Sequence, residues 1–82
     1  MTDSSTLSDL RPGQFALVQS LHNAGGMRRR LQDIGLIENT LVECLGISPL
    51  GDPAAFCIRG AVIALRREDS RDVSVRVLPE GR

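Results

Sequence analysis

The side chains that could carry out chemistry are few in this 82-residue chain. It has one histidine, His22, and two cysteines, Cys44 and Cys57. Nucleophilic catalysis needs a Ser or Cys beside a His that a third group orients, and the residues around His22 offer no such set. The sequence also has no Walker-type phosphate loop and no pair of carboxylates spaced for a glycine-lined cleft. We therefore predict that the chain is not an enzyme.

The same three side chains are the ones that a transition metal would select. They do not form the close pairs that structural zinc sites use. Cys44 shares a strand face with Val42, which favours a buried and inert thiol, whereas Cys57 points to the opposite face. The candidate ligands for an iron or zinc ion are therefore His22 and Cys57, and His22 could also hold a metal between two molecules. We expect no cofactor to be required.

Three consecutive arginines, Arg28, Arg29 and Arg30, form another candidate site. Guanidinium groups suit both phosphates and the carboxylates of an acidic partner. The alternative is a solvated helix face that Asp33 balances, and we favour it for Arg28. Arg30 lies nearer the apolar side chains of the helix, where its stem could cover them, so packing and partner binding both stay open for it.

The segment Pro49–Pro53 is the strongest candidate for a binding site. Its two prolines fix the backbone around Leu50, Gly51 and Asp52, so little conformational entropy is lost when a partner binds. An exposed leucine beside a fixed carboxylate is a suitable contact for another protein. The alternative is a stiff turn in which Asp52 hydrogen-bonds its own backbone, and the sequence does not choose between them.

One short helix must position the arginines. Met27, Leu31 and Ile34 recur at helical spacing and predict a helix over Gly26–Gly35 with one apolar face. Gly35 follows the last of them, where a left-handed residue ends a helix without steric cost. A helix this short is marginal alone in water, so it must pack against a small sheet.

Five segments alternate as strands do, over residues 15–21, 40–47, 54–59, 61–66 and 73–77. Turn residues separate them at short intervals, which favours a mainly β fold, a small closed five-stranded barrel with the helix inserted between its first two strands. Both phenylalanines, Phe15 and Phe56, are expected in the core. We predict one domain over residues 7–78, with flexible tails at 1–6 and 79–82.

Composition excludes several classes of protein. Ten arginines, with no lysine, balance ten acidic residues to give a net charge of zero, which argues against a protein that binds nucleic acid. The absence of Trp and Tyr removes the platforms on which bases or proline-rich peptides stack. No apolar run is long enough to insert in a membrane, and the polar start is no secretory signal, so we expect a cytoplasmic protein.

Five motifs recur in an order that matches a known family. They are Leu7-x-x-Leu10-x-Pro12-Gly13, Arg30-Leu31-x-x-x-Gly35-Leu36, Pro49-Leu50-Gly51-Asp52-Pro53, Arg59-Gly60 and Leu65-Arg66. From Leu7 to Val77 the chain resembles ferrous iron transport protein A, the FeoA family. One departure is Asn39, which stands where the family usually has Gly, and Asn tolerates the same backbone region.

The resemblance implies an SH3-like barrel that serves bacterial ferrous iron uptake. It implies that the chain regulates the ferrous iron permease by binding the cytosolic GTP-binding domain of that permease. The partner-binding residues that follow from these motifs and the Pro49–Pro53 segment are Arg30, Leu31, Leu50, Gly51, Asp52 and Arg59.

Two other functions are considered as alternatives to regulation of the permease. One is a transition-metal-binding regulatory domain like the C-terminal domain of iron-dependent repressors. The other is a small-barrel RNA-binding protein, against which the neutral charge and missing aromatics count. An unpaired edge strand could also form a homodimer.

Overall fold

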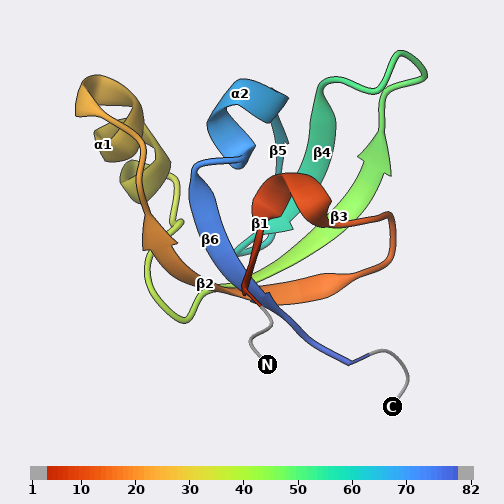
Figure 1. The fold of residues 1–82 in the computed structure, drawn as a ribbon, viewed down its shortest axis with the longest axis horizontal. Coiled ribbons are helices and arrows are strands. Elements are labelled where there is room, and N and C mark those ends of the chain that lie inside the picture. Colours follow the sequence, from red (N-terminus) through yellow and green to blue (C-terminus); the bar gives the residue numbers. More distant parts are fainter. Residues whose placement is uncertain (1–3, 80–82) are drawn as a thin grey trace.

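The computed structural model describes residues 4–79, which form an antiparallel sheet that carries short helices (Figure 1). The strands are β1 (Ser4–Thr6), β2 (Phe15–Leu21), β3 (Leu41–Ile47), β4 (Ala54–Ile58), β5 (Ala61–Leu65) and β6 (Val73–Val77). The helices are α1 (Gly25–Asp33) and α2 (Arg67–Ser70), with a 3₁₀ turn, η1, over Leu7–Asp9. The strands lie in the order β1-β6-β2-β3-β4-β5.

The predicted mainly β fold is confirmed, whereas the closed five-stranded barrel is corrected. The five predicted strands correspond to β2–β6, and β1 is a sixth that pairs with β6 through Ser5 and Val75. The strand pairing forms an open sheet with β1 and β5 at its edges. Helix α1 consequently lies between the second and third strands of the chain.

The predicted N-terminal tail is also corrected at residues 4–6. Ser4–Thr6 forms β1 because its backbone hydrogen-bonds to β6, which requires no apolar pattern in the side chains. Residues 1–3 and 80–82 of the predicted tails lie outside the described part of the chain.

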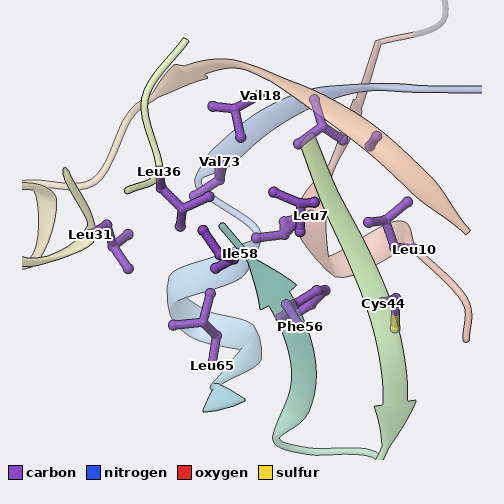
Figure 2. Close-up of a cluster of buried hydrophobic side chains, with 13 residues drawn as sticks. Leu7, Leu10, Val18, Leu31, Leu36, Cys44, Phe56, Ile58, Leu65 and Val73 are labelled. Carbon is purple, nitrogen blue, oxygen red and sulfur yellow. The ribbon is translucent and has the colours of Figure 1, made fainter. Parts of the chain in front are cut away.

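The core is built from alternating side chains of the strands, closed by η1 and by the residues around α1. Figure 2 shows Leu7, Ile58 and Val73 converging in one cluster. Phe56 is buried, as predicted, but Phe15 is 40% exposed, and the prediction that it lies in the core is wrong. Strand β2 has apolar residues on both faces, and the face with Ala16 and Val18 packs inward.

Helix α1 is attached to this core at its C-terminal end. Leu31 and Leu36 are fully buried, and Met27 and Ile34 pack partly against the core, as the predicted apolar face requires. Gly35 has φ +109°, the left-handed conformation expected of the residue that ends the helix. The Leu36 N–H donates to the Leu31 carbonyl at 3.0 Å and completes the cap.

A two-residue turn, Arg59-Gly60, joins β4 to β5. Both residues have positive φ, 52° for Arg59 and 86° for Gly60, and Ile58 pairs directly with Ala61. This is the type I′ geometry, whose twist matches that of the two strands it connects. The longest helix within residues 4–79 has nine residues. No helix in this part of the chain is long and apolar enough to cross a membrane.

Candidate protein-binding surface

The predicted partner-binding residues do not gather at one place. Leu31 is 1% exposed and lies in the core, so it offers almost no surface to a partner. It sits at the centre of the apolar face of α1, and this packing explains its place in the Arg30-Leu31 motif. The prediction that Leu31 binds a partner is therefore corrected, while its neighbour Arg30 is exposed.

The Pro49–Pro53 loop presents one large apolar side chain to solvent. Leu50 is 94% exposed, the most exposed of the large apolar residues in the described chain. Gly51 has φ +91°, and its N–H donates to the Ser48 carbonyl at 2.7 Å. The Ser48 N–H in turn donates to the Pro53 carbonyl at 3.0 Å, so the loop is closed by its own backbone.

Asp52 fixes this loop to the rest of the molecule. Its Oδ1 accepts a hydrogen bond from the backbone N–H of Arg67 at 2.9 Å. Arg67 is the first residue of α2, and the N–H groups at a helix start have no partner within the helix. Asp52 therefore caps another element, fifteen residues away, which neither alternative drawn from the sequence had proposed.

A groove separates α1 from the edge strand β5. Its volume is about 430 Å³, and it is lined by Met27, Arg30, Leu31 and Ile34 of α1, Ile63, Ala64, Leu65 and Arg66 of β5 and the residue after it, and Glu68 and Asp69 of α2. Six of the ten lining residues are apolar and four are charged, two of each sign, so the walls are mixed. Two of the predicted partner-binding residues, Arg30 and Leu31, line this groove, and of the two only Arg30 is exposed.

Sequence reasoning missed the β5 wall of the groove. Every residue of Ala61–Leu65 is apolar, so both faces of this strand must meet apolar surroundings or stay exposed. This uninterrupted apolar run was the feature of the sequence that could have indicated an exposed apolar wall. An edge strand without charge or proline is unusual because its free backbone groups can pair with other chains.

Helix α2 connects the groove and the loop. Glu68 and Asp69 line the groove, and Arg67 is held by Asp52 of the loop. Figure 1 shows α1, α2 and the β3–β4 connection along the top of the view, with α2 between the other two. We name this part of the molecule the helix surface: the α1–β5 groove, α2 and the Pro49–Pro53 loop.

The two candidate metal ligands lie far apart. Cys57 pairs with Glu43, which pairs with Phe15 at the start of β2, whereas His22 follows the end of that strand. Seven residues of extended chain span roughly 20 Å, so the two side chains cannot share one ion. Residues 4–79 contain no group of three His, Cys, Asp or Glu residues arranged to hold a metal.

His22 and Cys44 are occupied by other contacts. The Nε2 atom of His22 lies 3.0 Å from the Ser20 Oγ and 3.1 Å from the Ser74 Oγ, in an exposed position. Cys44 is fully buried, as predicted, and this burial raises the pKa of its thiol. Because the thiolate is the form that binds metals, Cys44 is a poor ligand.

Arg59 lies in the turn that follows β4 and is exposed. It borders a hollow that also includes Phe15, Leu41, Glu43 and Cys57. Its stem runs so close to Gly35 that a Cβ at Gly35 would overlap the Arg59 Cδ. The absence of a side chain at Gly35 thus makes room for Arg59, which gives both residues a structural role.

Comparison with known proteins identifies the fold. The model of the FeoA domain matches residues 5–77, nearly the whole described chain. The chain belongs to the FeoA family. A curated relative, the Fe(2+) transport protein A/Fe(2+) transporter FeoB fusion protein of Porphyromonas gingivalis, is 28% identical over 72 residues. These cover 88% of this chain but only 8% of the fusion protein.

Solved FeoA structures have the same fold. The solution structure of FeoA from Chlorobium tepidum has a TM-score of 0.86 at 32% identity, covering 94% of this chain and 73% of that one. The zinc complex of FeoA from Stenotrophomonas maltophilia, described as a procaryotic SH3 domain protein, has a TM-score of 0.77 at 27% identity over 85% and 87% of the two chains. The SH3-like fold expected from the sequence is therefore confirmed.

The fold also occurs outside iron transport proteins. A manganese-dependent transcriptional repressor has a TM-score of 0.83 at 19% identity, and 95% of this chain matches 43% of the repressor. At this identity the likeness concerns the fold alone. The zinc in the complex of the Stenotrophomonas protein belongs to that protein, and its ligands are not transferred to this FeoA domain.

Proposed function

We propose that this FeoA domain is an accessory protein of ferrous iron uptake that binds the GTP-binding domain of the ferrous iron permease. The observation that carries the proposal is the relative in which protein A and FeoB form one polypeptide. Joining two modules raises their effective concentration to the millimolar range, which favours a pair that must meet. Because that domain of the permease is cytosolic in the family that the sequence resembles, the chain would act in the cytoplasm.

The helix surface is the part of the molecule best suited to this partner. Leu50 is a 94% exposed apolar side chain on a fixed loop, so a partner that covers it removes apolar surface from water with little loss of conformational entropy. The α1–β5 groove adds six apolar side chains beside four charged ones, which include Arg30 and Glu68. An apolar centre with a polar rim is the usual anatomy of a protein interface. We assign partner binding to this surface, and the chain would act by binding, without a reaction of its own.

Titration of the purified GTP-binding domain with this protein, followed by calorimetry, tests the proposal. We expect Leu50→Ala and Arg30→Ala each to weaken binding about tenfold, which corresponds to about 1.4 kcal/mol. The matched controls are Ile37→Ala, another exposed apolar residue, and Arg28→Ala on the same helix outside the groove. Both controls should bind like the unaltered protein.

Two results would contradict the proposal at different levels. If the unaltered protein does not bind the GTP-binding domain, the proposed function is wrong. If it binds but Leu50→Ala and Arg30→Ala behave like the controls, the function stands and the helix surface is the wrong site.

A further inference from the structure

The face of the sheet turned away from the core is unusually apolar. We name it the outer face and define it by Phe15, Leu41, Glu43, Cys57, Arg59 and Val62. Strand pairing aligns four of these in one row, because Phe15 lies opposite Glu43, Glu43 opposite Cys57, and Cys57 opposite Val62. Residues opposite each other on neighbouring strands share one face.

The three large apolar side chains of this face are exposed to solvent. Phe15 is 40% exposed, Leu41 49% and Val62 68%. The first two, together with Glu43, Cys57 and Arg59, line one shallow hollow of about 360 Å³. A contiguous exposed apolar patch on a small protein marks a surface that another molecule covers.

The two charges in this hollow have opposite signs. Glu43 is half-buried in the middle of the row, and Arg59 is exposed at its edge, in the turn that follows β4. A partner that covers the hollow must supply a counter-charge to both Glu43 and Arg59, because an ionic group buried without a counter-charge is strongly destabilising. The covering surface must therefore place a base over Glu43 and an acid over Arg59.

A second copy of the same face meets this requirement. We propose that two copies associate through their outer faces around a two-fold axis that runs parallel to the sheets. Such an axis between Glu43 and Arg59 sets Glu43 against the partner subunit's Arg59 and, by symmetry, Arg59 against the partner subunit's Glu43. The net charge of the chain is zero, so no long-range repulsion opposes the approach of two copies.

The same axis brings the two Cys57 side chains together. Cys57 is opposite Glu43 and precedes Arg59 by two residues, so it lies between the two charges. Four strands are only about 19 Å wide at their usual spacing, which places the interface at the small end of specific contacts. We expect a dimer that forms reversibly and depends on protein concentration.

Sedimentation velocity with charge variants tests the arrangement. Glu43→Arg places like charges in contact across the axis, and so does Arg59→Glu, so each variant alone should dimerise at least about tenfold more weakly than the unaltered chain. An equimolar mixture of the two variants restores both ion pairs and should form a heterodimer at the original strength. Recovery in the mixture also shows that both variants are folded.

Thiol cross-linking provides a second measurement on the unaltered chain. A short bismaleimide should join two copies through Cys57, and Cys57→Ser should abolish the product, because Cys44 is buried. A chain that stays monomeric at all concentrations overturns the proposal. So does a dimer that both charge variants retain without Cys57 cross-linking, which would point to pairing through the edge of β5. The proposal is independent of the proposed function, because the helix surface stays free in this dimer.

Discussion

At the scale of single residues, the two cysteines show how strand position decides chemistry. Cys44 and Cys57 lie on neighbouring strands, but they belong to opposite faces of the sheet. Cys44 is enclosed by the core, and the loss of solvation raises the pKa of its thiol above the usual value. Cys57 is half-exposed on the outer face. Which face of the sheet each side chain occupies therefore makes the Cys44 thiol inert and leaves the Cys57 thiol accessible.

The raised pKa of Cys44 predicts how stability depends on alkaline pH. In the folded chain the thiol stays protonated at pH values where it ionises in the unfolded chain, so unfolding releases a proton. The free energy of unfolding should therefore be unaffected by this group below the usual thiol pKa of 9.0 and should fall as the pH rises above it. Urea unfolding at a series of pH values measures this slope.

The composition makes this slope easy to assign. The chain has no tyrosine, and all ten of its basic residues are arginine, so few other groups titrate between pH 9 and 11. Cys44→Ala should lower stability by a constant amount through its cavity and should flatten the alkaline slope. Cys57→Ser leaves Cys44 in place and should retain the slope. An equally steep slope in Cys44→Ala would assign the effect to another group.

At the scale of elements, α2 depends on a residue from elsewhere in the chain. This four-residue helix has no side-chain cap of its own, because its N-cap residue is Arg66. Asp52 supplies the missing acceptor to Arg67 and at the same time holds the Pro49–Pro53 loop. The hydrogen bond thus couples the exposure of Leu50 to the position of α2.

Removing this cap has a defined expected effect. Asp52→Ala leaves the Arg67 N–H without its acceptor and should lower the free energy of unfolding by about 1 kcal/mol, the usual cost of a lost helix cap. Asp52→Asn keeps an oxygen acceptor and should lose less. Amide hydrogen exchange at Arg67 should be faster in Asp52→Ala than in Asp52→Asn. Unchanged exchange in Asp52→Ala would show that the hydrogen bond does not hold α2.

The elements with an apolar period could be predicted, and the others could not. Met27, Leu31 and Ile34 fixed α1, and alternation gave β2 to β6 with nearly the observed bounds. Strand β1 was missed because Ser4–Thr6 is polar and pairs through its backbone. Phe15 was misplaced because β2 is apolar on both faces, and only the whole core decides which face turns inward.

The candidate site was less predictable for a related reason. Leu50 could be recognised as exposed because two prolines lie near it in the sequence, and this signal is contained in a few neighbouring residues. The bond from Asp52 to Arg67 and the groove between α1 and β5 join residues far apart in the chain. Such contacts follow from strand order, which the sequence of one protein does not encode locally. Leu31 was misassigned for a different reason: it belongs to a family motif, but its role in the structure is to pack in the core.

At the scale of the whole molecule, the helix surface and the outer face lie on different sides of one sheet. Strand β5 belongs to both, because Ile63 and Leu65 line the groove while Val62 lies on the outer face. A small domain of this kind can bind a partner through one side and a second copy through the other. If the chain and the permease are supplied as separate proteins, the strength of the proposed contact depends on their concentrations.

The fused relative suggests a prediction about this concentration dependence. In cells that supply the chain as a separate protein, Leu50→Ala should lower ferrous iron uptake, because the weakened complex is mostly dissociated. When the same variant is joined to the permease by a flexible linker, uptake should return to nearly the level of the linked, unaltered chain. The linker raises the effective concentration of the variant to the millimolar range, which exceeds a tenfold loss of affinity.

Measured uptake of labelled Fe(II), with equal amounts of each protein, distinguishes affinity from other causes. Ile37→Ala is the matched control and should support normal uptake in both arrangements. A variant that fails equally when separate and when linked would place Leu50 in a step after binding, since a higher local concentration cannot restore such a step. Normal uptake by the separate Leu50→Ala protein would instead remove Leu50 from the contact with the permease.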